Sequence, residues 1–375
     1  MYKFVKVTSL YQKALTSWSN TEKRGAKLSY SEAMDSINYQ AYGWSDFYES
    51  ELGKFGVEST QIIANSDFHQ QLWAQENQVD KSGLDLLIEQ LKRLKPDVVL
   101  FEDSHTYGGK ILEQIKIDVP SIKCTVGFNC APCSPSALEG FKAFNFVLTC
   151  TLGFKVEMEK AGVNTYLINH AFHQPVLDRI QLSNTVEHDT VFVGGIFLGT
   201  DFHNRRRKLI ENLINKAGSL TIYGYLNESI SWKRKITNSI IPGHNYSRGL
   251  KRQIRTPKFG LEMYQVMRDS KIVLNNHIDA VKEYAGNMRL FEATGIGSCL
   301  LTDNKTNIRD LFDVGNEIVV YDSPADCVDK IRWLLDNEKE REEIAVAGQK
   351  RTLKEHTFKE RAVQLHQLII GVLGG

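Results

Sequence analysis

Short apolar runs alternate with helical stretches along most of this chain, and this alternation constrains the fold more than any other feature. In the first half the runs are rich in β-branched and aromatic residues, which are typical of strands. They predict strands at Lys3–Val7, Ser59–Ala64, Asp97–Glu102, Lys123–Gly127, Phe146–Cys150 and Tyr166–Asn169, with helices between them, notably Gly83–Leu94 and Thr106–Ile117. Nearly continuous apolar strands separated by helices indicate a parallel sheet covered on both faces, which is a doubly wound α/β domain.

A second series of the same kind follows a polar segment, Phe172–Thr190, which is typical of a connection between domains. Strands are predicted at Thr190–Val193, Ser219–Tyr223, Lys271–Leu274, Ser298–Thr302 and Glu317–Val320, and helices at Arg205–Ala217, Leu261–Asp269, Asn287–Thr294, near Arg309, and at Ala325–Asn337. The sequence therefore predicts two Rossmann-like domains, residues 1–172 and 189–358, that face each other across a ligand cleft. A C-terminal helix, residues 359–375, is expected to pack back toward the first domain.

The composition is that of a folded protein, with 42% hydrophobic and 24% charged residues among 375. The 46 basic and 45 acidic residues nearly cancel, which removes the global argument for a nucleic-acid-binding protein. No run approaches the ~20 apolar residues of a membrane span, and the N-terminus lacks the layout of a secretion signal. A cytoplasmic location is therefore expected.

The six cysteines are scattered along the chain, which is not the pattern of a disulfide framework. Cys130 and Cys133 form a lone CxxC motif in a stretch that contains two prolines. A zinc site would need two more ligands at workable spacing, and a redox motif would be expected to open a helix. We interpret these two residues as free thiols in a loop.

The strongest functional signal lies in Ser270–Asp303. A predicted strand ends at Leu274, a polar loop that includes His277 follows, and Asn287 opens a helix with Glu292 one turn in. In open α/β sheets, ligands bind beyond the carboxyl ends of the strands, where helix N-termini favour anions. This order of strand, polar loop and helix predicts that a phosphate or diphosphate binds at the start of the helix. It also predicts that the hydroxyls of a ribose donate hydrogen bonds to Glu292.

Each of these residues also has a simpler interpretation. Glu292 lies three residues after Arg289, so the two could form an ion pair on a surface helix, worth ~0.5 kcal/mol or less. His277 is as compatible with a hydrogen-bonded structural histidine as with a ligand-binding one. The complete order of strand, polar loop, Asn287, helix and Gly-x-Gly favours the functional interpretation.

The segment NMRLFEATGIGSCLLTD, with SKIVLNNH before it, resembles the C-terminal half of group 1 glycosyltransferases. The resemblance is nearest the branch of spore-maturation-type (CgeB-like) proteins and runs from about Asp189 to Phe358. It implies the GT-B fold, in which two Rossmann-like domains hold a nucleotide-sugar donor mainly through the C-terminal one. It also implies that Glu292 binds the donor ribose and that Gly194-Gly195 lies against the diphosphate. Many relatives carry two glutamates eight positions apart, whereas here the earlier position is Tyr284.

Other candidate donor-binding residues follow from the same positional rule. No Asp-x-Asp motif occurs, so the leaving diphosphate would be neutralised by cations instead of a metal ion. Arg289 and one or two residues of Arg205–Lys208 are the candidates. Gly194-Gly195 is equally well explained as a tight turn. Tyr223-Gly224 lies at the end of a predicted strand. It either flanks the nucleobase or takes part in ordinary core packing.

The first domain carries the candidate catalytic residues, Asp103 and His105, directly after the predicted strand Asp97–Glu102. An inverting transferase needs a base within ~3 Å of the acceptor hydroxyl, and either side chain has suitable chemistry. The alternative for Asp103 is a helix cap. His170 and His173, in the connecting segment, either line the cleft or are structural.

Residues 229–261 contain eight basic residues and no acidic one. This stretch is either a solvated loop or a contact for an anionic acceptor or for membrane headgroups. Taken together, the sequence predicts a glycosyltransferase, without cofactor or metal, that moves a sugar from a nucleotide diphosphate sugar to a hydroxyl of a glycan or glycolipid. The alternatives are a nucleotide-sugar epimerase on the same fold and an inactive relative that binds a glycan or nucleotide.

Overall fold

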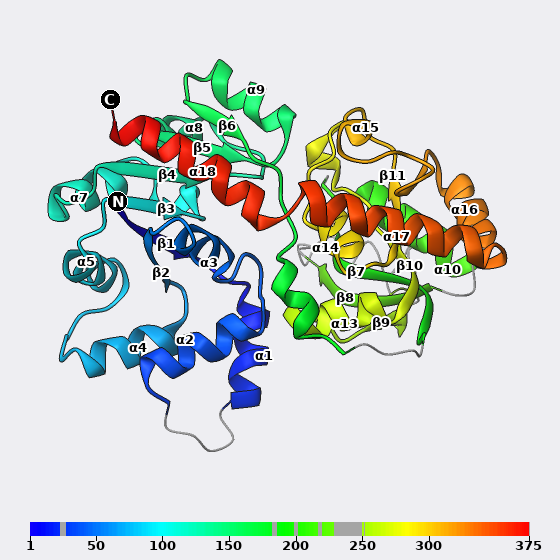
Figure 1. Ribbon diagram of the computed structural model, residues 1–375, viewed down its shortest axis with the longest axis horizontal. Helices are drawn as coiled ribbons and strands as arrows, with labels where there is room; N and C mark the ends of the chain where they lie inside the picture. Colours follow the sequence, from blue (N-terminus) through cyan, green and yellow to red (C-terminus); the bar gives the residue numbers. More distant parts are fainter. Residues whose placement is uncertain are drawn as a thin grey trace, which may run out of the picture. The chain divides into compact units, whose positions relative to one another are not determined.

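A computed structural model describes residues 1–22, 28–181, 186–198, 202–216, 220–228, 250 and 252–374 of the chain. Its contacts divide the chain into two units. The first unit comprises residues 1–169 and 358–375, and the second comprises residues 170–357. These boundaries differ slightly from the predicted ones, because Phe172 already pairs with Thr357 inside the second unit. Each unit is built on a parallel sheet with helices on both faces (Figure 1).

The first unit has a six-stranded sheet in the order β2-β1-β3-β4-β5-β6. Its strands are β1 (Lys3–Thr8), β2 (Glu58–Ile63), β3 (Val98–Phe101), β4 (Cys124–Phe128), β5 (Phe146–Thr149) and β6 (Thr165–Leu167). The helices are α1 (Gln12–Glu22), α2 (Tyr30–Tyr39), α3 (Phe47–Gly53), α4 (Asp67–Glu76), α5 (Gly83–Leu94), α6 (Ser104–Tyr107), α7 (Lys110–Asp118), α8 (Pro135–Phe141), α9 (Leu152–Lys160) and α18 (Phe358–Leu373). The C-terminal helix α18 packs on α3 and β4, and therefore belongs to this unit.

The second unit also has a six-stranded sheet, in the order β12-β11-β10-β7-β8-β9. Its strands are β7 (His188–Leu198), β8 (Leu220–Glu228), β9 (Ile254–Arg255), β10 (Ser270–Leu274), β11 (Cys299–Asp303) and β12 (Val319–Tyr321). The helices are α10 (Asn204–Lys216), α13 (Gly260–Arg268), α14 (Arg289–Gly295), α15 (Ile308–Leu311), α16 (Pro324–Asp336) and α17 (Glu338–Glu355), with short 3-10 turns η1 (Gln174–Asp178) and η2 (Asp279–Val281). The predicted doubly wound α/β fold is confirmed for both sheets.

Hydrophobic periodicity explains the elements that were predicted best. All four residues of β3 are buried, as expected for a central strand covered on both faces. Helix α5 matches its predicted bounds and buries Leu86, Leu87 and Leu91 on one stripe. The expected single helix Thr106–Ile117 is instead two helices, because Gly109 has φ +60° and breaks the hydrogen-bonding pattern between α6 and α7.

The prediction that Cys130 is a free thiol is wrong. Cys130 forms a disulfide with Cys150, with the two Cα atoms 5.7 Å apart, within the range that a disulfide spans. Cys130 comes soon after β4 and Cys150 directly follows β5, and these two strands are neighbours in the sheet. Sheet order, which spacing along the sequence does not reveal, brings the two residues together. Cys133 is a free thiol, as expected.

Strand order places one switch point in each sheet, meaning the pair of adjacent strands from which the chain winds in opposite directions. In the first sheet it lies between β1 and β3, and in the second between β7 and β10. The crevice beyond the carboxyl ends of such a pair is the usual ligand site in doubly wound folds. These two places are therefore the first to search for function.

Candidate functional site

At the switch point of the second unit, strand β7 is longer than its neighbour β10. The two strands pair only from His188 to Phe192, while β7 continues to Leu198 beside β8. Beyond Phe192, one edge of β7 has no partner strand among the described residues, and its backbone carbonyls need other hydrogen-bond donors. This unpaired edge is the floor of the candidate site.

Two arginines satisfy these carbonyls. Arg206, on α10, donates to the carbonyl oxygen of Gly195 at 3.1 Å and to that of Asn276, just after β10, at 2.5 Å. Arg289, the first residue of α14, donates to the carbonyl of Val193 at 3.4 Å. Two guanidinium groups therefore lie side by side along the edge of β7.

Arg206 is held in an unusual environment for a cation. Burial lowers the pKa of its guanidinium to about 10, with Asp303 opposing this shift and Arg289 adding to it. Its Nε is buried and has no hydrogen-bond partner among the described residues. A partly desolvated cation with an unused donor is suited to bind an anion.

Glu292 lies one turn into α14 and is 5% exposed. Its carboxylate is 2.8 Å from Arg289, so the simpler interpretation, an ion pair between them, applies. It also accepts a hydrogen bond from the buried hydroxyl of Tyr264 on α13. Burial raises the pKa of Glu292, and Arg289 and Tyr264 oppose that rise. Glu292 is buried and Arg289 is only partly exposed, so the two do not form an exposed surface ion pair.

His277 is part of the scaffold of this site. It is 2% exposed, and its Nδ1 lies 2.8 Å from Asp303 at the end of β11. Its Nε2 accepts a hydrogen bond from the backbone N–H of Gly286 at 3.4 Å, so both ring nitrogens are engaged within the protein. Burial alone would raise the pKa of Asp303, but His277 and Lys305, 3.3 Å away, hold that pKa well below its usual range. His277 thus fixes the loop before α14.

Asn287 has a similar role. Its side-chain amide and that of Asn275 exchange two hydrogen bonds, of 2.7 and 3.2 Å, across the loop. Helix α14 starts two residues later than predicted, at Arg289, and spans seven residues. So short a helix has a weak dipole, and the two arginines are the main source of positive charge at this point.

The predicted position of Gly194-Gly195 in a loop is wrong. Both residues lie inside β7, where they pair with Gly224 and Tyr225 of β8. A side chain at Gly224 would overlap the carbonyl oxygen of Gly194, so this glycine is required for the two strands to pair. Gly194 and Gly195 nevertheless lie on the part of β7 that extends past β10, next to Arg206.

The structure does not bring Tyr223 to the candidate site. Its hydroxyl lies 3.3 Å from His188, the first residue of β7, at the amino end of the sheet. The guanidinium of Arg255 on β9 stacks over its ring at 5.6 Å and donates to the hydroxyl at 3.2 Å. These contacts support the structural interpretation of Tyr223.

The switch point of the first unit has the opposite character. Lys6 of β1 is fully buried and lies 3.2 Å from the carboxylate of Glu49 on α3. Glu102, directly after β3, accepts a hydrogen bond from the hydroxyl of Thr8. Burial raises the pKa of Glu102 to about 7, although Lys6 lowers it. Sequence analysis did not single out this buried cluster, which contains more carboxylates than cations.

The two predicted catalytic residues follow Glu102. Asp103 caps α6: its Oδ1 and Oδ2 accept hydrogen bonds from the backbone N–H and the hydroxyl of Thr106, at 3.1 and 2.6 Å. His105 is exposed, and its Nε2 lies 3.0 Å from the side-chain amide of Asn129, just after β4. The alternative interpretation of Asp103 as a helix cap therefore applies.

Residues 205–367 match a family described as glycosyl transferase-like. No curated protein matches the chain in sequence. Among solved structures, HepE of Anabaena has a TM-score of 0.63 at 10% identity, covering 99% of this chain and 100% of that protein. Sucrose-phosphate synthase of Thermosynechococcus elongatus has a TM-score of 0.58 at 8% identity over 100% of both chains. A glycosyltransferase of Rickettsia africae has a TM-score of 0.54 at 10% identity, covering 99% and 98%.

The chain is a glycosyltransferase with the GT-B fold. The family match covers α10, which carries Arg206, and α14, which carries Arg289 and Glu292. The predicted glycosyltransferase activity and the predicted fold are thus confirmed. The spore-maturation branch and the individual site residues remain predictions.

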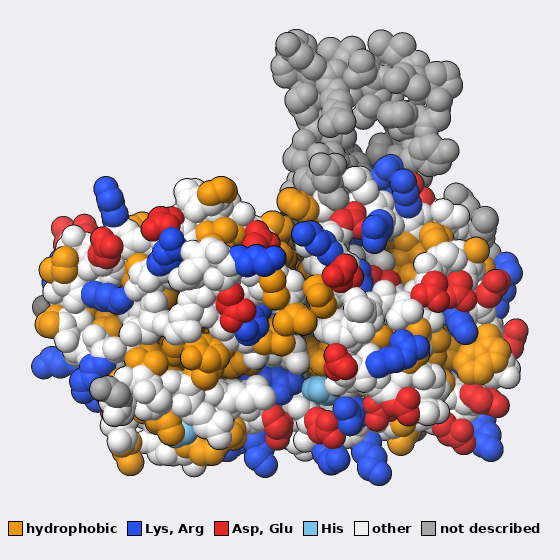
Figure 2. Space-filling model, turned by 90° about the horizontal axis from the view of Figure 1, so that it is seen from above, with side chains coloured by type: hydrophobic (Ala, Val, Ile, Leu, Met, Phe, Trp, Pro, Cys, Tyr) orange, Lys and Arg blue, Asp and Glu red, His pale blue; other side chains and the backbone are white. Residues whose placement is uncertain are grey.

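Other surfaces of this glycosyltransferase offer less evidence for a functional site. The largest part of the basic stretch, residues 229–249 and 251, lies outside the described residues. Of the described remainder, Arg255 contacts Tyr223 and Lys258 pairs with Glu262. On the face shown in Figure 2, basic and acidic side chains are interspersed over the described residues. No helix among the described residues is both long and apolar enough to cross a membrane.

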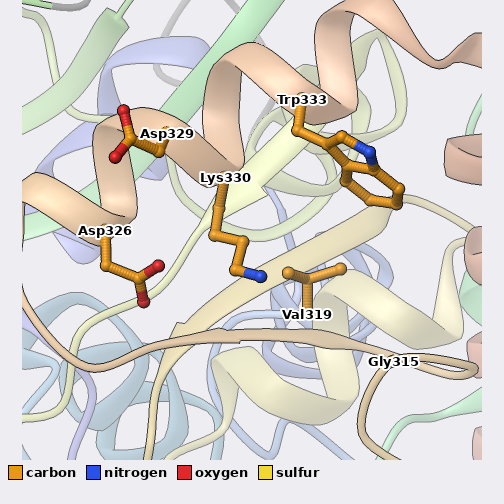
Figure 3. Close-up of a pocket in the computed structure, with 6 residues that line it drawn as sticks. All are labelled: Gly315, Val319, Asp326, Asp329, Lys330 and Trp333. Atoms are coloured by element: carbon orange, nitrogen blue, oxygen red, sulfur yellow. The ribbon is translucent and has the colours of Figure 1, made fainter.

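A separate pocket lies between α16 and β12, lined by Gly315, Val319, Asp326, Asp329, Lys330 and Trp333 (Figure 3). Val319 is the first residue of β12, so this pocket lies toward the amino end of the strand, away from the switch point. None of the predicted site residues lines it.

Sequence reasoning missed several residues described above as part of the two sites, among them Glu102, Asp303 and Tyr264. Glu102 and Asp303 both stand at the ends of central strands, so the positional rule that selected Asp103 and His277 could also have found them. Tyr264 lies in mid-helix on α13, and no pattern in the sequence marks it.

Proposed function

We propose that this glycosyltransferase takes a hexose from a UDP-sugar and passes it to a hydroxyl of a glycan or glycolipid, without a metal ion. HepE of Anabaena has been solved with UDP-glucose and with UDP and glucose, which supports a UDP-sugar as the donor. We further propose that the chain belongs to the spore-maturation branch and that basic residues of 229–261 contact an anionic acceptor or the membrane surface.

The observation that carries the proposal is the pair of arginines on the unpaired edge of β7. When the sugar leaves, negative charge develops on the diphosphate, and pre-positioned cations in a dry site stabilise that charge most effectively. The unused Nε of Arg206 provides a donor for a phosphate oxygen. In this proposal Arg206 and Arg289 hold the diphosphate.

Glu292 has a different role in the same proposal. Ribose hydroxyls donate hydrogen bonds, and a buried carboxylate accepts them strongly. Burial raises the pKa of Glu292, and the ion pair with Arg289 opposes that rise by favouring the charged carboxylate. We propose that Arg289 turns toward the diphosphate when the donor binds, and that the ribose takes its place at Glu292.

The pairing of the carboxylates at this switch point supports the proposal that the enzyme needs no metal ion. Glu292 is paired with Arg289, and Asp303 with His277 and Lys305. A magnesium ion on a diphosphate needs one or two carboxylates with free oxygens. The described residues at the switch point offer cations to the phosphates in place of such ligands.

Calorimetry with two probes tests the proposal. Arg206→Gln should weaken binding of both UDP and inorganic pyrophosphate by at least about tenfold, since charge-assisted hydrogen bonds contribute ~1.5–3 kcal/mol. Glu292→Gln should weaken UDP binding but leave pyrophosphate binding unchanged, because only UDP has a ribose. Arg207→Gln is the matched control, because Arg207 lies on the same helix and pairs with Glu211 at 3.3 Å.

Three outcomes would contradict the proposal. Wild-type affinity in Arg206→Gln would remove the diphosphate assignment, and equal losses of both probes in Glu292→Gln would remove the ribose assignment. A strict requirement for Mg²⁺ or Mn²⁺ in EDTA-treated protein would exclude metal independence. Release of UDP that depends on an added acceptor separates transfer from epimerisation and from binding without turnover.

A further inference from the structure

Helix α16 carries a second stripe of side chains beside the one that it buries. The buried stripe packs into the core of the second unit and consists of Cys327, Val328, Ile331 and Leu334. The second stripe lines the pocket between α16 and β12 (Figure 3) and consists of Asp326, Asp329, Lys330 and Trp333. Positions i, i+3, i+4 and i+7 share one face of a helix. These four side chains therefore form one continuous surface, which lies wholly within the second unit.

Trp333 is the most informative member of this stripe. Tryptophan side chains are highly buried on average, yet Trp333 is 43% exposed. Trp18 and Trp44 are buried. The guanidinium of Arg93 lies over the ring of Trp73 at 5.4 Å. Among the described residues, no ring or cation stacks on Trp333. Its indole face is thus left to water, and a ligand that covers this face gains hydrophobic free energy.

The polar groups of the stripe are also available to a ligand. Lys330 makes no hydrogen bond or ion pair with another described residue, and in Figure 3 its side chain extends from α16 toward β12. Asp326 uses one carboxylate oxygen, Oδ2, to accept the backbone N–H of Asp322 at 2.9 Å. Asp329 lies 3.8 Å from Arg332, and both side chains are exposed, so water screens this ion pair. A carboxylate only accepts hydrogen bonds and an ammonium group only donates them, so together they suit hydroxyls, which do both.

Charge and size narrow the class of ligand further. Two carboxylates and one ammonium group leave the pocket with a net negative charge, which disfavours phosphates and nucleotides. The volume of about 370 Å³ is at the small end of the ~300–1,000 Å³ range of small-molecule sites. A pyranose ring has a face of C–H groups and an edge of hydroxyls. C–H groups are attracted to the electron-rich face of an aromatic ring, so a neutral sugar matches both the indole and the polar groups.

We propose that this pocket is a second carbohydrate-binding site, which holds one neutral sugar residue of a glycan chain. The sugar ring stacks on the indole of Trp333, and its hydroxyls bind Lys330 and the two aspartates. The pocket lies toward the amino end of β12, whereas the proposed donor site lies where β7 extends past the carboxyl end of β10. The pocket therefore holds a glycan without touching the reacting atoms. This inference goes beyond the proposed function and does not depend on it.

Saturation-transfer NMR on the full chain tests the inference. The probes are hexasaccharides of glucose, galactose and N-acetylglucosamine, and the wild-type protein should bind at least one of them. Trp333→Leu should weaken that binding by at least about fivefold, because it keeps an apolar side chain but loses the aromatic face. Trp333→Phe should stay within about twofold of the wild type, and Lys330→Met should lose about threefold. Val346→Ala is the control, because Val346 is an exposed apolar residue of α17 in the same unit.

Each result decides between assignments. Wild-type protein that binds none of the three hexasaccharides, or Trp333→Leu that binds them as the wild type does, would overturn the inference. If Trp333→Leu does not fold, Lys330→Met decides, and unchanged binding in that variant would overturn it. Binding of tetralysine that depends on Trp333, with no hexasaccharide bound, would assign the pocket to a basic peptide instead.

Titration with UDP separates this pocket from the donor site. Trp333→Leu should bind UDP with wild-type affinity, because the pocket and the donor site lie at different ends of the sheet. A folded Trp333→Leu that lost both UDP and the hexasaccharide would contradict a separate site. Wild-type protein that binds a hexasaccharide but no UDP would contradict the proposed function and leave this second site in place.

Discussion

The two units share a topology but carry opposite charge at their switch points. In the second unit, Arg206 and Arg289 line the edge of β7, and the carboxylates nearby are paired. In the first unit, Glu49 and Glu102 share a single buried cation, Lys6. A doubly wound sheet fixes where a ligand lies, because the carboxyl ends of its central strands form a crevice. The residues placed there decide which ligand chemistry is favoured.

This difference bears on where an anionic donor can bind. An anionic donor needs cations and loses little by approaching a carboxylate that is already paired. A crevice in which carboxylates outnumber cations repels a diphosphate instead. We therefore expect that changing the charge balance in each unit will have separate effects on stability, donor binding and turnover.

The largest effect is expected from Lys6→Met. It leaves Glu49 and Glu102 buried without a counter-charge, and breaking a buried pair in this way costs about 3–5 kcal/mol. Both carboxyls already have a raised pKa, so the folded state binds more protons than the unfolded state above about pH 4.5. The loss of stability should therefore be largest at pH 8 and smaller at pH 5.

Thermal unfolding across this pH range measures the effect. The control is Lys3→Met. Lys3 lies on β1, as Lys6 does, and it is the exposed partner of Glu58 on β2. A defect of equal size at pH 5 and pH 8 would show that the two carboxyls do not titrate as a coupled cluster, and would weaken the contrast between the units.

A smaller effect is expected from Arg289→Met in the second unit. Glu292 keeps its hydrogen bond from Tyr264, and Arg289 is partly exposed, so we expect a loss of about 2 kcal/mol. Replacing both partners, Arg289→Met with Glu292→Gln, should recover most of this stability, because no unpaired charge then remains. UDP binding should stay weak in both variants.

Calorimetric unfolding together with UDP titration separates the two properties. If the double variant recovered its affinity for UDP as well as its stability, Arg289 would act only by holding Glu292. The proposal that Arg289 binds the diphosphate would then be wrong. If neither property recovered, the charge on Glu292 would not be the cause of the instability.

Sequence patterns predicted the fold well because the spacing of apolar residues indicates which positions are buried. The runs at β3, β4, β5, β10 and β11 are mostly apolar and mostly buried, and helices such as α5 carry one apolar stripe. The site was predicted less completely. Glu292 and Arg289 were found from their position on a helix that follows a strand and a polar loop, but the hydrogen bond between Arg206 and Gly195 depends on how far β7 extends past β10. The Cys130–Cys150 disulfide depends likewise on the order of strands. Neither strand length nor sheet order can be read from local periodicity.

The smallest effect tests whether Asp103, next to the first switch point, acts in chemistry. Asp103 caps α6, so Asp103→Ala should cost about 1 kcal/mol, whereas Asp103→Asn should cost almost nothing because asparagine caps a helix equally well. A cap also predicts that Asp103→Asn keeps the wild-type rate of UDP release from UDP-glucose. A catalytic base at this position predicts instead that both variants lose the rate. If Asp103→Asn were stable but inactive, Asp103 would act in the reaction, and the carboxylates of the first unit would not serve the fold alone.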